Sequence, residues 1–314
     1  ICMDIRKLAL ETCPSRFSRR NKKRFLSALD EIFEEEGYAG KDIDKRRLFL
    51  TRDRMYAFEK TAKLYVVVPY DTPERLFWHK TKHYPLDGNR SLNSNMVATY
   101  VPAVIFYVLI LLFITFVVPL FEDPLVQGFI NLVVFICTLL LIVLLIKGVS
   151  NRHNHNRNSA AVIAAVEFMQ SLNKDQKRRV GFVFTDRNRR RCEGAAILMK
   201  YFQEQKKNPD IIELNCIGTG DTVGIGYRMH GKRLAALLNA GKNGMKTRMS
   251  DMNGDRCLQT SMYYFEKGVM ISCGTPDEKG GLLVSNTQNG KDRVMEERNL
   301  STVKQLLMKA AERL

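Results

Sequence analysis

Several signatures that identify common function classes are missing from this sequence of 314 residues. The seven cysteines include no Cys-x-x-Cys pair, and their odd number disfavours the disulfide framework of a secreted protein. No Gly-x-Ser-x-Gly segment is present, so a serine-hydrolase triad cannot be assigned. Zinc-finger spacing, an aromatic RNA-binding signature and a sustained basic helix are also absent, so nucleic acid is not an expected partner.

Basic residues are missing from one long part of the chain. Between positions 96 and 146 there is no Lys or Arg, and the only acidic residues are Glu122 and Asp123. Two apolar runs, Val97–Leu120 and Leu125–Ile146, each reach the roughly 20 residues that a helix needs to cross about 30 Å of hydrocarbon. Soluble helices that are apolar all round over this length are rare, and the polar segment before the first run excludes a signal peptide. We therefore predict a two-helix transmembrane hairpin at 96–146, with the lipid bilayer as a partner.

The charges that flank this hairpin predict its orientation. Arg90 precedes it and Lys147, Arg152 and Arg157 follow it, whereas the turn between the two runs is acidic. A positive-inside bias would keep both ends of the hairpin in the cytoplasm. We therefore expect a two-pass protein of the cell membrane whose termini and soluble parts are cytoplasmic. The net charge of +16 divides into +6 before the hairpin, −2 within it and +12 after it, which suits contact with anionic lipids.

The segments on either side of the hairpin, 1–95 and 147–314, are expected to form one domain. Before the hairpin, Asn21–Gly37 has the apolar spacing of an amphipathic helix, and Lys63–Tyr70 has the consecutive valines of a strand buried on both faces. After it, the pattern predicts helices 159–172, 193–205, 231–240 and 300–314 and strands 179–186, 210–217, 268–273 and 281–284.

This alternation is typical of a largely parallel sheet covered on both faces. The strand at 63–70 would lack a sheet in a separate domain, so both segments are expected to contribute to one sheet. The predicted fold class is therefore α/β, with a mostly parallel mixed sheet between helices, interrupted by the transmembrane hairpin. Residues 72–95 are expected to form an irregular lead into the membrane.

The order of motifs resembles the zinc-dependent aminopeptidases, the family that includes bacterial leucyl aminopeptidases and the ectodomain of the transferrin receptor. In that family a strand ends in His-x-Asp, a loop with Asp-Asn-x-x-Gly opens a helix, a strand ends in Glu-Glu, the next ends in Asp, and a late loop supplies a second His. The corresponding segments here, in the same order, are Val68–Asp71, Arg157–Ala161, Phe182–Arg189, Glu213–Cys216 and Val284–Thr287. The resemblance spans nearly all of both soluble segments and implies the aminopeptidase fold.

Most residues that carry the family's chemistry are replaced. The ligand and base positions of the family correspond to Pro69, Arg157, Asn188, Arg189, Cys216 and Asn286, and only Asp71 and Asn158 keep the family's residue type. A pair of zinc ions needs carboxylate and imidazole ligands and a base that deprotonates water. Proline cannot ligate, and arginine is a permanent cation that repels a dication. The resemblance therefore implies an inactive site with no catalytic residue, metal or other cofactor.

The same replacements point to a different ligand. Arg157 and Arg189 would place two fixed positive charges where the family holds dications, with Asn158, Asn188 and Asp71 beside them. Guanidinium groups suit carboxylates and phosphates. Because the hairpin is inserted between the loop after Asp71 and the loop with Arg157, this site would face the membrane. The hypothesis is a binding or scaffold module that recognises an anionic lipid headgroup or a peptide terminus, together with an unidentified protein partner.

Other interpretations stay open. The two arginines would need no ligand if they pair with acids such as Asp71 and Asp186. A purely structural subunit of a membrane assembly is a further alternative. The Gly218–Gly224 stretch is interpreted as a turn rather than a dinucleotide-binding loop, because its glycine spacing differs from that motif. An active hydrolase with displaced ligands would use Asp71, His155, Asp186 and Asp221.

Overall fold

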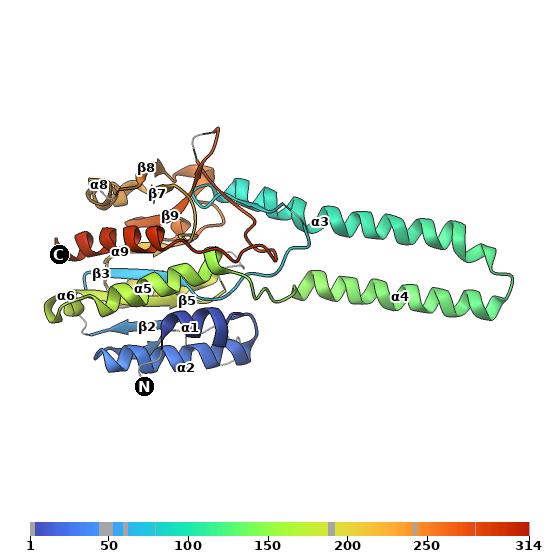
Figure 1. The fold of residues 1–314 in the computed structure, drawn as a ribbon, viewed down its shortest axis with the longest axis horizontal. Coiled ribbons are helices and arrows are strands. Elements are labelled where there is room, and N and C mark those ends of the chain that lie inside the picture. Colours follow the sequence, from blue (N-terminus) through green and yellow to red (C-terminus); the bar gives the residue numbers. More distant parts are fainter. Residues whose placement is uncertain are drawn as a thin grey trace.

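A computed structural model describes residues 4–43, 53–58, 62–78, 80–187, 192–240, 244–279 and 281–313. It confirms a mixed α/β fold in which a central sheet is packed between helices. Two long helices project together from one end of this body (Figure 1).

Strands from both sides of the hairpin form one sheet. β3 (Leu64–Pro69), which precedes the hairpin, lies between β5 (Val180–Thr185) and β6 (Asp210–Leu214), and it is parallel to both. The order of strands is β1-β2-β5-β3-β6-β9-β10-β4, and β7 pairs with β9 and β8. The other strands are β1 (Ala39–Asp42), β2 (Arg54–Ala57), β4 (Lys82–His83), β7 (Thr222–Tyr227), β8 (Lys246–Asp251), β9 (Gly268–Pro276) and β10 (Leu282–Ser285).

The sheet is more mixed than the sequence predicts. Parallel pairing joins β5, β3, β6 and β9, and also β7 with β8. Antiparallel pairing joins β1 with β2, β2 with β5, β7 with β9, β9 with β10, and β10 with β4. The expectation of a mostly parallel sheet therefore holds for the centre and for β7 with β8, and is wrong for the other margins. Of these, β9 and β10 are joined by the short connection 277–281, which antiparallel neighbours permit.

Helices cover the two faces of the sheet. One core contains buried side chains from α2 (Arg19–Glu35), α5 (Ala160–Gln170), α8 (Lys232–Asn239) and α9 (Glu297–Glu312). The opposite core contains buried side chains from α7 (Glu193–Glu204). All six residues of β3 are buried, as the consecutive valines predict. The remaining short helices include α1 (Ile5–Lys7) and α6 (Lys174–Arg179).

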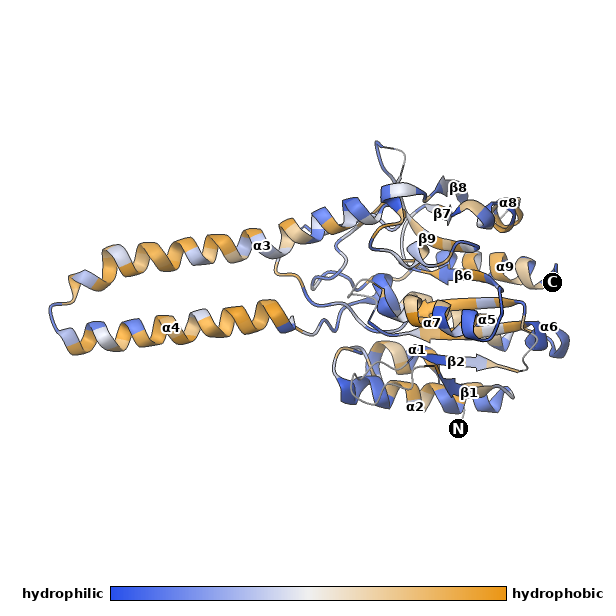
Figure 2. Cartoon of the chain, turned by 180° about the vertical axis from the view of Figure 1, so that it is seen from behind, coloured by the Kyte–Doolittle hydropathy of each residue, from blue (hydrophilic) through white to orange (hydrophobic). Residues whose placement is uncertain are grey.

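The two apolar runs form the projecting helices. α3 (Gly88–Leu112) continues through further helical turns to Leu120, and α4 (Pro124–Lys147) returns after a short turn. Both helices are long and apolar enough to cross a membrane. Beyond the first turns of α3, both helices consist mostly of apolar residues, drawn orange in Figure 2. Most of their large apolar side chains are exposed.

Two sequence expectations are corrected by the structure. Residues 72–95 are not irregular throughout, because α3 already begins at Gly88, where the Asp87 side chain accepts a hydrogen bond from the Arg90 backbone N–H. The Gly218–Gly224 stretch is a turn only as far as Asp221, since β7 begins at Thr222. A Cβ at Gly224 would lie 2.3 Å from Leu282 Cδ1, so this glycine serves close packing within the sheet layer.

Candidate functional site

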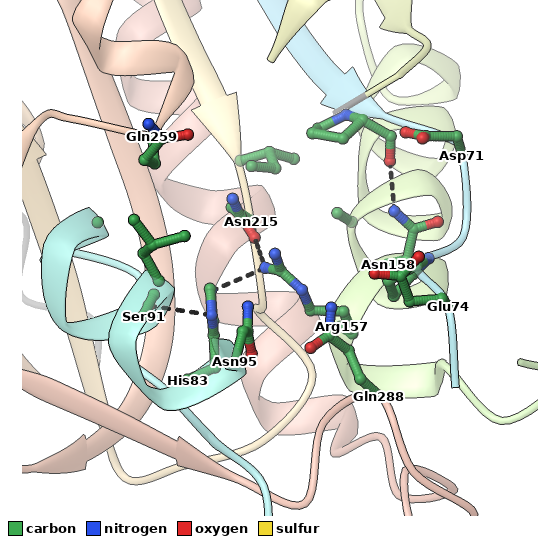
Figure 3. A pocket seen from close by; sticks show the side chains of 16 residues that line it. Asp71, Glu74, His83, Ser91, Asn95, Arg157, Asn158, Asn215, Gln259 and Gln288 are labelled. Atoms are coloured by element: carbon green, nitrogen blue, oxygen red, sulfur yellow. Dashed lines mark hydrogen bonds between the residues drawn. The ribbon is translucent and has the colours of Figure 1, made fainter. Parts of the chain in front are cut away.

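A polar cavity of about 140 Å³ lies where β3 and β6 end, beside the first turns of α3 (Figure 3). Pro69 and Asp71 line it from the end of β3, and Leu214 and Asn215 from the end of β6. The other lining residues come from β4, the start of α3, α5 with the turn that opens it, and three loops: Pro73, Glu74, His83, Gly88, Ser91, Leu92, Asn95, Arg157, Asn158, Ala161, Gln259 and Gln288. The cavity therefore joins the sheet domain to the base of the projecting hairpin.

Arg157 is held in this cavity by neutral partners. Its Nη1 donates hydrogen bonds to Asn215 Oδ1 at 2.5 Å, to His83 Nε2 at 2.8 Å and to Cys216 Sγ at 3.0 Å. Among the described residues, these recorded side-chain partners include no carboxylate. These three partners hold the guanidinium in position and do not neutralise its positive charge.

His83 connects Arg157 to helix α3. Because a guanidinium has no acceptor atom, Nε2 of His83 must be the unprotonated nitrogen, and Nδ1 carries the proton. Nδ1 lies 3.1 Å from Ser91 Oγ, and that hydroxyl donates to the Tyr84 carbonyl at 2.8 Å. Burial, together with the nearby charge of Arg157, lowers the pKa of His83 well below its usual value. His83 is therefore a neutral bridge between the cavity and α3.

Asp292 fixes the backbone on which Arg157 stands. One of its carboxylate oxygens accepts from the Asn156 N–H at 2.8 Å and the other from the Arg157 N–H at 3.2 Å. These N–H groups lie at the start of a helix, where the backbone favours a nearby negative charge. Burial nevertheless dominates and raises the pKa of Asp292 to about 6.

A buried cation, Arg16, holds the other side of the site. Its Nη2 donates to Asn158 Oδ1 at 2.8 Å, and its Nε donates to the Tyr70 carbonyl at 2.8 Å. Asn158 in turn donates to the Pro69 carbonyl at 2.7 Å, so Arg16 ties the end of β3 to the start of α5. Burial lowers the pKa of Arg16 to about 10, and the charge of Asp71 acts against that shift. The remaining acceptors are Ala9 O, Cys13 O, Asn154 Oδ1 and Ser159 Oγ.

Glu213 is a buried ionisable side chain next to the site. It lies on β6, two residues before Asn215, whose Nδ2 is 3.4 Å from Glu213 Oε1. Its other oxygen has no hydrogen-bond partner among the described residues. Burial raises the pKa of Glu213 to about 8, against the opposing effects of Asn215 and Arg157.

Comparison with known proteins shows the fold and not the activity. No family model matches the sequence, and no curated protein matches it either. Among solved structures, a glutaminyl cyclase of Porphyromonas gingivalis superposes with a TM-score of 0.60 at 11% identity, over 99% of this chain and 96% of that one. A Zn-dependent exopeptidase of Parabacteroides distasonis superposes with a TM-score of 0.60 at 10% identity, over 98% of this chain and 95% of that one. The LapA aminopeptidase of Legionella pneumophila superposes with a TM-score of 0.56 at 10% identity, over 99% of this chain and 71% of that one.

The chain has an aminopeptidase-like fold. This confirms the fold that the order of motifs implies. The solved structures with this fold include both exopeptidases and cyclases, so the aminopeptidase-like fold by itself does not fix a reaction.

The structure brings some of the predicted site residues together. Asp71, Arg157 and Asn158 line the same cavity. Asn188 and Arg189 lie outside the described residues. Sequence reasoning missed the other members of the site, of which the most important are Arg16, His83, Ser91, Asn215 and Gln259.

The side chains of the alternative hydrolase site do not meet in the described part of the chain. Asp186 forms an ion pair with Lys22, and Asp221 is exposed. His155 Nδ1 lies 2.7 Å from the Arg293 carbonyl oxygen. Over these described ranges, no three His, Cys, Asp or Glu side chains come together as metal ligands would.

Proposed function

We propose that this chain is a membrane-anchored, catalytically inactive aminopeptidase-like domain that binds an anionic group next to the membrane and so acts as a binding or scaffold module. The observation that carries the proposal is the position of Arg157, a fixed cation in a polar cavity with neutral side-chain partners. A guanidinium in such surroundings is suited to bind a carboxylate or phosphate.

The donors in the cavity do not suit a pair of zinc ions. The one described imidazole that lines it, His83, already directs its unprotonated Nε2 to Arg157. A dication bound there would also lie close to the permanent charge of that guanidinium, which opposes binding. These residues support a site that holds an anion in place of metal chemistry.

The hairpin supports the membrane part of the proposal. The cavity is lined by Ser91, Leu92 and Asn95 of α3, and the apolar part of the same helix begins directly after them. With the basic flanks on the cytoplasmic side, the cavity would open close to the inner surface of the bilayer.

Anion binding is tested with sn-glycerol 3-phosphate as the probe and the full chain in detergent, by calorimetry. Arg157→Gln is expected to weaken binding by about 10- to 100-fold, because a charge-assisted hydrogen bond is lost. Arg152→Gln removes an exposed arginine nearby and serves as the matched control. Equal binding by the Arg157→Gln variant and the unmodified chain contradicts the proposed site.

The absence of catalysis is tested separately. The purified chain, supplied with Zn²⁺, is expected to release no amine from aminoacyl anilides. Turnover that disappears in an Asp71→Asn variant would show an active hydrolase and overturn this part of the proposal.

A further inference from the structure

A second cavity adjoins the polar one at the base of the hairpin. It has a volume of about 240 Å³ and lies between α3 and α4. Its walls are mostly apolar, with Ala98, Pro102 and Phe106 on α3 facing Leu141, Leu144 and Leu145 on α4. Glu74 lines both cavities. The two cavities therefore meet at one residue and differ sharply in polarity.

One face of α3 runs along both cavities. Ser91 and Asn95 line the polar cavity, and Ala98, Pro102 and Phe106 line the apolar one. These positions are spaced by three or four residues, which places them on the same side of a helix. The polar surface changes to an apolar one where the predicted membrane run begins. A ligand along this face would be polar at one end and apolar at the other.

Charges of both signs surround the polar cavity. Arg157, Asp71 and Glu74 line it, and the buried cation Arg16 lies close enough to Asp71 for the two charges to interact. His83 is neutral. Asp292, which accepts from the Arg157 backbone N–H, adds a third carboxylate, and Arg75 lines the adjoining apolar cavity, so charges of both signs surround the site. A ligand with only negative charge would be attracted by Arg157 and opposed by the carboxylates, whereas a ligand with a charge of each sign would be attracted at both of its ends.

Amide side chains complete the wall of the polar cavity. Amides can donate to phosphate oxygens and accept from ammonium hydrogens, so they suit a ligand that carries a charge of each sign. The amides that line it are Asn95, Asn158, Asn215, Gln259 and Gln288.

We propose that the two cavities form one binding site for a phospholipid whose headgroup carries a phosphate and an ammonium group. The phosphate lies on Arg157, the ammonium group faces Asp71 and Glu74, and an acyl chain lies between α3 and α4. This assignment rests on the anion site proposed above and adds the class of its ligand.

The test compares three probes against the full chain in detergent: phosphatidylethanolamine, phosphatidylglycerol and free phosphoethanolamine. Native mass spectrometry and calorimetry report the binding. Phosphatidylethanolamine is expected to bind at least about tenfold more tightly than either of the other probes, because only it offers both charges and an acyl chain. Glu74→Gln is expected to reduce its advantage over phosphatidylglycerol.

The acyl-chain part of the site is tested by filling the apolar cavity. Ala103→Trp places a large side chain there, and Val104→Trp places the same side chain on the exposed surface of the same helix. The first variant is expected to lose the preference for phosphatidylethanolamine over phosphoethanolamine, and the second to keep it. Retained binding of free phosphoethanolamine shows that the Ala103→Trp variant is folded.

The outcomes separate the two proposals. Loss of phosphoethanolamine binding in Arg157→Gln, combined with equal or tighter binding of phosphatidylglycerol, overturns the lipid assignment and leaves the anion site intact. If all three probes bind equally well to the unmodified chain and to the Arg157→Gln variant, both proposals are overturned. If the Ala103→Trp variant binds phosphatidylethanolamine as tightly as the Val104→Trp variant does, the acyl chain does not lie in the apolar cavity.

Discussion

Arg157 donates a hydrogen bond to His83 Nε2 at 2.8 Å, and these two residues are 74 positions apart, on opposite sides of the hairpin in the sequence. His83 then contacts Ser91 on α3. The proposed ligand-binding cation is thereby connected to a predicted membrane helix through one neutral imidazole. A change at any of the three groups is expected to affect both the cavity and the seating of the hairpin.

His83 makes the stability of the domain sensitive to acid. Its folded-state pKa lies well below the usual 6.5, so the stability it contributes is present above about pH 6.5 and is lost as pH falls. The free energy of unfolding should drop less between about pH 6.5 and 5 in His83→Gln, which has no proton to gain. His230→Gln, at an exposed histidine, is the control and should follow the unmodified chain. Urea unfolding over this pH range provides the measurement.

The start of α3 fits closely against a loop of the soluble domain. A Cβ at Gly88 would lie 1.8 Å from the Leu258 carbonyl oxygen, so Gly88→Ala forces the helix and the loop apart. We expect a loss of roughly 2 kcal/mol in stability and faster proteolysis near residue 258. At Gly128 on α4 nothing lies within 4 Å, so Gly128→Ala should be neutral or slightly stabilising. Similar stabilities for the two variants would show that α3 is not docked in this way.

Arg16 organises the site from inside the core. Its guanidinium donates to six oxygen atoms and is fully buried, so Arg16→Met leaves several buried acceptors without a donor. The expected loss is roughly 3 kcal/mol or more in the free energy of unfolding. Arg16→Lys should also be destabilised, because one ammonium cannot replace the planar set of donors. Arg19→Met, at an exposed position on α2, is expected to change stability by no more than about 0.5 kcal/mol.

Glu213 imposes a cost at alkaline pH. Since its folded-state pKa is raised to about 8, the protein loses stability as pH rises from about 4.5 through that value. Glu213→Gln removes the ionisation, so the variant should be more stable than the unmodified chain by roughly 2 to 4 kcal/mol near pH 8. Near pH 5 this difference in stability should be smaller. Thermal unfolding at both pH values checks this. Glu204→Gln, on the exposed side of α7, keeps Glu213, so its stability should follow that of the unmodified chain at both pH values.

The hairpin is expected to keep both of its ends in the cytoplasm. With exposed Cys137 replaced by Ser, a cysteine introduced at Asp123 should react with an impermeant reagent in intact cells, and one introduced at Lys147 should be protected. The opposite labelling pattern would mean an inverted topology.

The sequence by itself determined those features that arise from local composition and periodicity. A stretch of 51 residues without Lys or Arg predicts the two projecting helices, and the valines of Lys63–Tyr70 predict a buried central strand. The alternation after the hairpin gave helices and strands within a few residues of their observed bounds. The order of motifs was enough for the aminopeptidase-like fold. The polar edge strands β1 and β8 were missed, because neither has an apolar pattern of its own.

Only the tertiary structure decided how the site is built. The sequence contains 49 Lys and Arg, and nothing local distinguishes buried Arg16 from the many exposed ones. Its bonds to Asn154 and Asn158 span 138 and 142 positions, and Arg157 reaches Asn215 across 58. The docking of Gly88 and Ser91 likewise depends on loops that meet only when the sheet is complete. Such contacts between distant residues depend on the packing of the whole chain, so local sequence patterns do not encode them.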